Sequence, residues 1–313
     1  MGKLKQTPKP LFSVIIPAHN EQETIGKAIE SICVQTEKNF EIIVVDDGST
    51  DNTSKVIESY RKKEPRLRLV ISSKNGSSAA QARNLGASWA AGKYLLFHDA
   101  DCIADACLLN NAAKCFDDYD VDGIATKTLN TKPKNWIQRA VAAQRTIRWE
   151  YSQSKMMYID GNSGINVAIM RRDAFELLGG FDEKIFYFED NDLTKRFFEA
   201  DYSAMFDPSV IQYHEDPLTL KESLGQCKSI AKGLTKKKNW TTREKITINF
   251  SLIFVVCLFG GLLTPILLTI PLTAFVFIFT GMSIKSKDVV GSFYFSILYF
   301  IRSIAKMWYY FKV

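Results

Sequence analysis

The sequence predicts an α/β fold with a mainly parallel sheet flanked by helices. Short apolar runs rich in β-branched residues alternate with helical segments through the first hundred residues, which is the rhythm of βα units. The runs are apolar at nearly every position, as expected for strands that are buried on both faces of a parallel sheet. The expected strands are 12–17, 40–46, 67–72 and 93–98, and the expected helices are 21–34, 52–63 and 78–91.

After residue 101 the alternation becomes looser. We expect a helix near 104–116, a strand near 121–127, a long helix near 134–151, a strand near 164–170 and a helix near 190–200. The long helix carries apolar residues at helical spacing with three arginines beside them. This pattern suits either a core helix with a basic rim or a helix that docks on a membrane surface.

Three of the expected strands end in polar residues. The carboxyl ends of parallel strands meet at one edge of a sheet, where ligands bind. Two carboxylates one residue apart at such an end can be aimed at one hard divalent cation, although an isolated Asp-x-Asp is more often a solvated turn. The residues at these ends are Pro17, Ala18, Asn20 and Glu21 after the first strand, Asp46 and Asp47 after the second, and Asp99 and Asp101 after the fourth.

In this order and spacing the motifs resemble those of family 2 glycosyltransferases, which have the GT-A nucleotide-sugar-binding fold. The resemblance implies an inverting, hexosyltransferase-type enzyme that uses a nucleotide-sugar donor and Mn or Mg. The matching segments cover most of residues 12–215: Ser13–Glu21, Asp46–Thr53, Asn75-Gly76, Ala82–Gly86, Lys93–Asp101, Gly161–Arg172, Gly179–Glu183 and Phe188–Leu193.

The resemblance also implies roles on the donor side. Loss of a nucleoside diphosphate develops negative charge, which a cation must neutralise. Asp99 is implied to contact the ribose and Asp101 to ligate the metal, and both are candidate metal ligands. Asp46 or Asp47 is implied to read the base, and Arg83 to approach the base or the diphosphate. The nucleotide contacts at the first strand end would come from Pro17, Ala18, Asn20 and Glu21.

One histidine is a further candidate metal ligand. Some GT-A enzymes complete the metal site with a histidine at the end of a late strand, and His214 follows such an apolar run. Neutral imidazole suits Mn²⁺. A hydrogen-bonded structural histidine is the alternative.

On the acceptor side, an inverting transfer needs a general base for the acceptor hydroxyl. Asp190 is the candidate, with Glu189 and Asp192 as supporting groups, because the pair follows the Gly179–Glu183 loop as in the family's acceptor motif. A carboxylate at a helix start can also be merely a cap. Asn162 stands in a Gly-rich turn and could bond sugar hydroxyls, or the turn could be an ordinary one.

The C-terminal part of the sequence predicts a membrane anchor. Residues 246–284 contain no charged residue, which is enough for two spans of about 20 residues each. Basic residues on both sides predict a multi-pass protein of the cell membrane with its catalytic domain in the cytoplasm. The expected divisions are a basic tail 1–10, a catalytic domain 11–231, a basic segment 232–245, a transmembrane hairpin 246–284, and 285–313 as an interfacial amphipathic helix or a third span.

The composition of the chain favours some classes of binding partner over others. The net charge of +6 suits attraction to a membrane surface rather than nucleic-acid binding. Six cysteines without a Cys-x-x-Cys pair indicate reduced thiols, and structural zinc is not expected. The expected partners are a nucleotide-sugar donor and a membrane-borne acceptor, a polyprenyl-linked phosphate or saccharide of a cell-surface glycan or glycoprotein pathway; a homo-oligomer is left open.

Two rival functions would each leave a different pattern in the sequence. A polymerising synthase would carry a Gln-x-x-Arg-Trp motif after the base, and residues 197–242 contain none. A catalytically silent nucleotide-sugar-binding scaffold subunit of a membrane complex would be expected to lose the base or the metal acids, and all of these are present. The enzyme is therefore the favoured interpretation.

Overall fold

The computed structural model describes residues 9–72, 78–151, 155–161, 163, 165–185, 188–216, 219–225, 227–228, 275–276, 278–280 and 289–312. The chain divides into two compact units. The first comprises Met1–Leu129 and Gln153–Glu215, and the second comprises Asn130–Ser152 and Asp216–Val313. The expected boundary at residue 231 stays a prediction, as do the other expected divisions.

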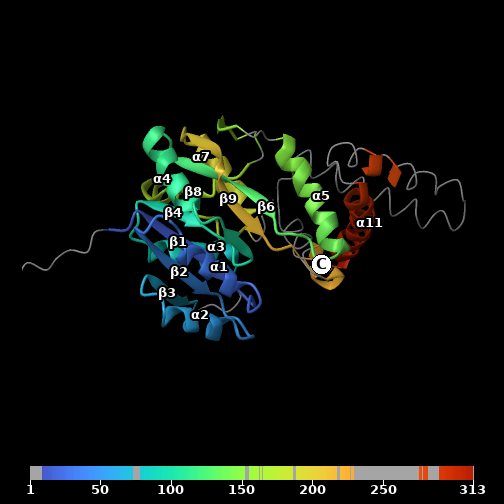
Figure 1. Cartoon of the computed structure of the whole chain (residues 1–313), viewed down its shortest axis with the longest axis horizontal. Coiled ribbons are helices and arrows are strands. Elements are labelled where there is room, and N and C mark those ends of the chain that lie inside the picture. Colours follow the sequence, from blue (N-terminus) through green and yellow to red (C-terminus); the bar gives the residue numbers. More distant parts are fainter. Residues whose placement is uncertain are drawn as a thin grey trace, which may run out of the picture. The chain divides into compact units, whose positions relative to one another are not determined.

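The first unit contains the expected parallel strands (Figure 1). Neighbouring strands in space are β3 (Leu67–Ile71), β2 (Phe40–Asp46), β1 (Phe12–Ala18) and β4 (Tyr94–Phe97), and all of these pairs are parallel. The intervening helices are α1 (Ile25–Cys33), α2 (Thr53–Arg61) and α3 (Ala79–Ser88). The βα alternation predicted for the first hundred residues is confirmed. β1 and β2 are buried along nearly their whole length, which explains their continuous apolar sequence.

Beyond β4 the sheet is antiparallel, so the described sheet as a whole is mixed. β8 (Ile169–Arg171) pairs with β4 and with β6 (Gly123–Asn130). β9 (Ala204–His214) pairs with β5 (Cys102–Ala104) and with β7 (Met157–Ile159). The helices of this half are α4 (Leu108–Asp118), α6 (Arg172–Leu177) and α7 (Glu189–Glu199). The strand order is β3-β2-β1-β4-β8-β6-β9-β5, with β7 beside β9.

Gly86 lets α3 lie close to the parallel strands. A Cβ atom at this position would stand 2.5 Å from Ile15 Cγ2 and 3.2 Å from Val45 Cγ2. Both partners are fully buried, so neither side chain has room to withdraw. The close approach fixes the height of α3 above β1 and β2, and with it the position of Arg83 one turn earlier on the helix.

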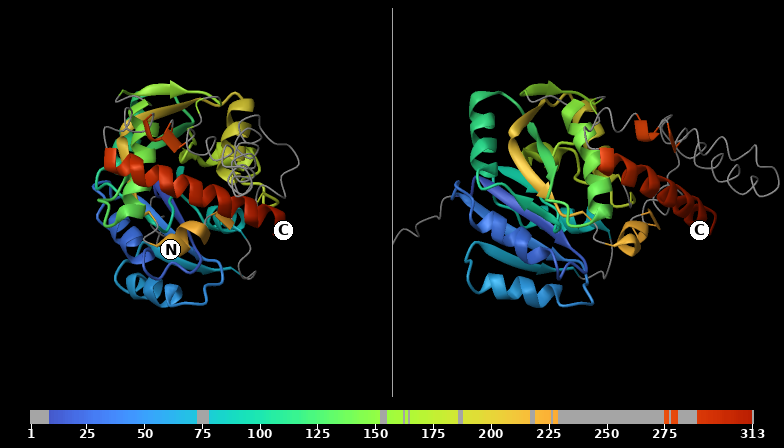
Figure 2. Two further views of the ribbon diagram at one scale, coloured as in Figure 1. Left: turned by 90° about the vertical axis from the view of Figure 1, so that its right-hand side faces the viewer. Right: turned by 45° about the vertical axis from the view of Figure 1, so that its right-hand side comes forward.

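The second unit contains a pair of packed helices, α5 (Trp136–Tyr151) and α11 (Val289–Lys312) (Figure 2). Ile137 and Ala140 on α5 share a buried cluster with Phe295 and Leu298 on α11. Residues 289–312 are helical, and the choice between an interfacial helix and a third span stays a prediction. α5 packs apolar residues within the unit, as the core interpretation of the sequence predicts. No helix among the residues described has the length and apolar character needed to cross a membrane. The expected hairpin 246–284, apart from 275–276 and 278–280, and the basic segment 232–245 lie outside the described residues.

We expect Gly86→Ala to lower the free energy of unfolding by about 1–3 kcal/mol, because the added methyl group overpacks a fully buried contact. The gain in helix propensity, about 1 kcal/mol, acts in the opposite direction and is outweighed. Urea denaturation followed by circular dichroism measures the change. Gly161→Ala is the control, since its Cβ would meet nothing closer than 3.6 Å. Equal stabilities of the two variants would contradict the close-packing account.

Candidate active site

The loops after β1 and β2 brace each other. Asn20 has a left-handed backbone with φ of 58°, a conformation that asparagine tolerates better than most residues. Its amide N–H donates to Ser49 Oγ at 3.0 Å, and its Oδ1 accepts the Thr50 N–H at 2.8 Å. Asp46 is buried, accepts the Ser49 N–H at 2.9 Å and also accepts from the Ser54 hydroxyl. These bonds hold the two loops at the carboxyl edge of the sheet.

The other candidates at these two strand ends lie at the same edge. Pro17 and Ala18 are the last residues of β1 and pair with Val45 and Asp46. Asp47 is buried, and its carbonyl oxygen lies 2.9 Å from His19 Nδ1.

Glu21 stands within electrostatic reach of the two acids after β4. Its Oε2 accepts the Thr24 hydroxyl at 2.6 Å. Burial raises the pKa of Glu21, and the negative charges of Asp101 and Asp99 raise it further. Three carboxylates from two strand ends therefore share one region, which favours the binding of a cation or a positively charged partner there.

Arg83 lies between two acids that come from different parts of the chain. Its Nη2 donates to Asp99 Oδ1 at 2.8 Å, and its Nη1 donates to the Glu189 carboxylate. The side chains of Arg83 and Glu189 are 12% and 11% exposed, whereas that of Asp99 is 50% exposed. Partial loss of water around Asp99 would by itself raise its pKa, but the charge of Arg83 holds that pKa below its usual value. Burial alone would lower the pKa of Arg83, and the two carboxylates instead raise it.

The ladder between β5 and β9 brings Asp101 and His214 together. Cys102 pairs with His214 in this ladder, and the Glu215 N–H donates to the Asp101 carbonyl at 2.8 Å. His214 Nε2 lies 3.3 Å from Asp101 Oδ2. Asp101, Cys102 and His214 each offer a ligand atom, and these atoms lie within 4.8 Å of one another. Carboxylate and imidazole donors fit a divalent transition-metal ion. Asp99 is not one of these three residues, and its Oδ1 accepts a hydrogen bond from Arg83.

Asp190 lies in the first turn of α7 and is held by Asn166. Asp190 Oδ2 accepts from Asn166 Nδ2 at 2.6 Å, and Oδ1 accepts the Asn191 N–H at 2.8 Å. The surrounding protein displaces water from this carboxylate and thereby raises the pKa of Asp190; the charge of Glu189 adds to the rise and Arg83 opposes it. The residue still reaches the surface, as a base that meets a second substrate must.

Sequence reasoning did not select Asn166. The available signal was a single polar residue inside the apolar run Ile165–Met170. Asn162 lies outside the described residues, so its expected role stays a prediction. Asp192 accepts from Arg196 Nε at 2.8 Å, and Arg196 donates to the carbonyls of Leu178 and Gly180. Asp192 thus braces the loop before α7 through Arg196, and its expected support of Asp190 stays a prediction.

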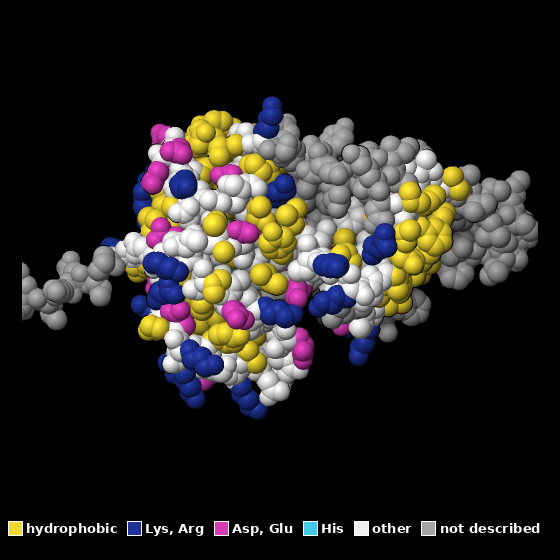
Figure 3. Space-filling view, viewed as in Figure 1, with side chains coloured by type: hydrophobic (Ala, Val, Ile, Leu, Met, Phe, Trp, Pro, Cys, Tyr) yellow, Lys and Arg dark blue, Asp and Glu magenta, His cyan; other side chains and the backbone are white. Residues whose placement is uncertain are grey.

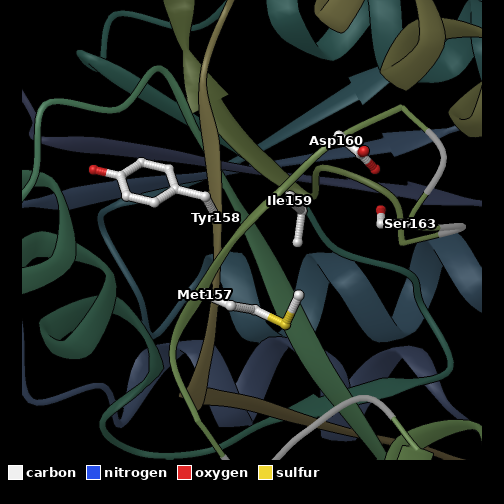
Figure 4. A pocket seen from close by; sticks show the side chains of 5 residues that line it. All are labelled: Met157, Tyr158, Ile159, Asp160 and Ser163. Atoms are coloured by element: carbon white, nitrogen blue, oxygen red, sulfur yellow. The ribbon is translucent and has the colours of Figure 1, made fainter.

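A pocket of about 370 Å³ lies at β7. Its lining residues are Met157, Tyr158, Ile159, Asp160 and Ser163. Asp160 and Ser163 lie near each other on the loop that follows β7, with Met157 farther along the strand (Figure 4). This loop leads within three residues to Asn166, the partner of Asp190. The pocket therefore combines apolar and polar surface, and it is close in sequence to Asn166, which contacts the candidate base.

We expect Arg83→Leu to lower the free energy of unfolding by about 3 kcal/mol, because it leaves the Glu189 carboxylate buried without its partner. Adding Glu189→Gln to this variant should restore most of the loss, since the uncompensated charge is then removed. Urea unfolding of wild type, both single variants and the double variant gives the coupling energy. Arg61→Leu, which breaks an exposed pair with Glu58, is the control and should change stability little. A double variant no more stable than Arg83→Leu would mean that Arg83 does not compensate Glu189.

Known proteins share this sequence pattern and fold. The sequence family described as Glycosyl transferase family 2 matches residues 13–179. The glycosyltransferase AglE of Haloferax volcanii is 30% identical over 208 residues, which cover 66% of this chain and 67% of AglE. The glycosyltransferase EpsJ of Bacillus subtilis, described as uncharacterised, is 28% identical over 222 residues, 68% of this chain. The match spans only 63% of the length of EpsJ. A match to another glycosyltransferase, GlyG of Streptococcus pneumoniae, spans only 37% of the length of GlyG.

Two solved structures share the fold. The mannosyltransferase PcManGT of Pyrobaculum calidifontis, in complex with GDP-Man and Mn2+, has a TM-score of 0.60 at 18% identity and covers 96% of this chain and 88% of its own. TarS 1–349 of S. aureus, in complex with UDP-GlcNAc, has a TM-score of 0.54 at 20% identity over 74% of this chain and 69% of its own. At these identities the likeness shows a shared GT-A-like α/β fold and nothing more specific. Since the family match covers more than half of the sequence, the chain belongs to glycosyl transferase family 2, as its motifs predict.

Proposed function

We propose that this protein is a metal-dependent, inverting glycosyltransferase that moves a sugar from a nucleotide-diphosphate donor to a membrane-borne acceptor. One observation carries the proposal. Arg83 contacts both Asp99, which follows the strand expected to hold the donor, and Glu189, which adjoins the candidate base Asp190. A single cationic side chain thus joins the expected donor side to the expected acceptor side, as a transfer between two substrates requires.

The donor would bind at the carboxyl ends of β1, β2 and β4. Asp101 and His214 would hold Mn or Mg, with Asp99 beside them, and the ion would neutralise the charge that develops on the departing diphosphate. Asn20, Glu21 and Asp46, with Asp47, Pro17 and Ala18, would contact the nucleotide. The two structural neighbours carry GDP-Man and UDP-GlcNAc, so the choice of nucleotide and sugar is a property of the individual protein.

Asp190 would act as the general base. In the transfer the acceptor hydroxyl oxygen forms a bond to the anomeric carbon on the face opposite to the bond that breaks, and Asp190 takes the hydroxyl proton. The hydrogen bond that Asn166 donates to Asp190 Oδ2 fixes the orientation of the Asp190 carboxylate. The raised pKa of Asp190 brings this carboxylate closer to the proton affinity that a base needs at neutral pH.

The acceptor would be a polyprenyl-linked phosphate or saccharide used in cell-surface glycan or glycoprotein synthesis. This part rests on the uncharged residues 246–284 and the basic residues on both sides, which predict an anchor with the catalytic domain on the cytoplasmic face. Val289, Val290 and Phe293 on α11 are exposed, and Figure 3 shows apolar side chains gathered over the α11 part of the second unit. Such a face suits the headgroup region of a bilayer.

We expect Asp190→Asn to lower kcat by about 10²- to 10⁴-fold and to leave donor affinity within about threefold, because the base acts on the acceptor. The test is a panel of nucleotide sugars with the purified full chain in detergent, using calorimetry for binding and release of nucleoside diphosphate for turnover. Asp117→Asn, on the exposed side of α4, is the matched control. Donor binding without turnover on any acceptor by the wild type would favour the silent scaffold subunit instead.

The pH profile gives an independent check of the same residue. A base is active only when deprotonated, so kcat should fall as the pH drops through the pKa of Asp190. Because that pKa is raised, the fall should occur above the value of about 3.9 that is usual for aspartate. The residual activity of Asp190→Asn should lack this fall, and a profile that is unchanged in the variant would assign the ionisation elsewhere.

We expect the full chain to stay with membranes after an alkaline carbonate wash. Val255→Arg combined with Val276→Arg should release it, since each charge near the centre of an expected span costs about 3 kcal/mol of insertion. The matched control carries alanine at both positions and keeps the chain length and α11. Immunoblotting of pellet and supernatant measures the partition, and retention of the arginine variant would place the anchor elsewhere.

A further inference from the structure

Cys102 lies at the pair of residues that we assign to the metal. It directly follows Asp101, is 1% exposed, and is the register partner of His214 in the antiparallel β5–β9 ladder. Residues directly opposite each other on antiparallel strands project from the same face of the sheet. The Cys102 thiol therefore lies on the same face as the His214 imidazole, and its Sγ is 3.8 Å from Asp101 Oδ1.

The three donor atoms are close to a cation-binding arrangement. The ligand atoms of Asp101, Cys102 and His214 lie within 4.8 Å of one another. In a tetrahedral zinc site the usual bond lengths place neighbouring oxygen, nitrogen and sulfur donors about 3.3–3.6 Å apart. The separation of His214 Nε2 from Asp101 Oδ2, 3.3 Å, already has this value. A contraction of at most about 1.5 Å between any two of the atoms would complete the set.

The backbone around these donors is held by hydrogen bonds. The Cys102 N–H donates to the Asp99 carbonyl at 3.0 Å, and the Cys102 carbonyl lies 3.0 Å from Nε2 of the buried His98. On the other strand, Glu215 forms an ion pair of 2.7 Å with Lys27 directly after His214. Ligands on such braced elements lose little freedom when a metal binds.

We propose that Asp101, Cys102 and His214 form a binding site for a borderline-soft divalent cation, Zn²⁺ in particular, with the cysteine sulfur as the third protein ligand. Thiolate ligands favour Zn²⁺ over Mn²⁺ and Mg²⁺, and Zn²⁺ also stands above Mn²⁺ in the general order of affinities. As the sulfur–zinc bond forms, the thiol proton passes to solvent. This is a three-ligand site with an open position, unlike the closed structural zinc sites that the cysteine spacing does not lead us to expect.

Because Asp101 and His214 are shared, Zn²⁺ and the hard cation of the transfer exclude each other. Zn²⁺ at this site would therefore inhibit turnover that Mn²⁺ supports. The binding of Zn²⁺ is independent of the activity of the protein, whereas this inhibition rests on the proposed function.

Cobalt absorption of the full chain in detergent tests the site without reference to turnover. Co²⁺ follows the same ligands and gives a thiolate charge-transfer band in the near ultraviolet when sulfur is bound. We expect the band in the wild type, its loss in Cys102→Ser, and its retention in Cys107→Ser, whose thiol is outside the group of three. Zn²⁺ should displace the Co²⁺, and Cys102→Ser should weaken Zn²⁺ binding by about 100-fold and Mn²⁺ binding by less than about tenfold.

Absence of the band in the wild type, or its persistence in Cys102→Ser, would overturn the site. If circular dichroism shows that Cys102→Ser is unfolded, Cys102→Ala is measured in its place, and the same two results apply. A cobalt band together with no turnover under any cation supports the zinc site and counts against the proposed function. A cobalt band with Mn²⁺-supported turnover that excess Zn²⁺ does not inhibit supports binding and overturns the competition.

Discussion

The buried guanidinium of Arg83 is the interaction on which the arrangement of the candidate site depends. Asp99 and Glu189 are far apart in the sequence and carry like charges, so they would repel each other without a cation between them. The positive charge of Arg83 compensates both carboxylates. They in turn stabilise the charged guanidinium, which burial alone would destabilise. Its planar fork of donors suits two carboxylates better than the single ammonium of a lysine would. The position of α7, and therefore that of Asp190, follows from this contact.

The height of α3 above the sheet makes this contact available. Gly86 allows the helix to approach Ile15 and Val45 at a distance that a side chain would prevent. Asn84, one residue after Arg83, holds the Phe181 backbone through its side chain. Its Nδ2 donates to the Phe181 carbonyl, and its Oδ1 accepts the Phe181 N–H. One short helix thus positions the loop before α7 and the ion pair to α7 together. Packing on the buried side and polar contacts on the other side are set by the same ten-residue segment.

The sequence predicted the βα half of the fold because β1 and β2 are buried on both faces and read as continuous apolar runs. It did not predict β5 or β7, since three-residue strands are too short to show a period, and it gave no register for β9. The candidate metal pair depends on that register: Asp101 and His214 meet only because Cys102 lies opposite His214. Asp190 was predicted from its motif. Its contact with Asn166 was not, because the two residues are 24 positions apart and are brought together by the path of the intervening chain. The engagement of Asp99 by Arg83 likewise comes from tertiary packing.

The pairing of α5 with α11 joins parts of the chain that are made at very different times. Ile137 and Ala140 are covered by Phe295 and Leu298, and α11 begins about 140 residues after α5 ends. At a synthesis rate of about 5–20 residues per second, the apolar face of α5 waits on the order of ten seconds for its partner. During that interval the exposed apolar face of α5 can bind chaperones or associate with other unfolded chains. The strands β1 to β3 have no such delay, because each pairs with strands that are made within the first hundred residues.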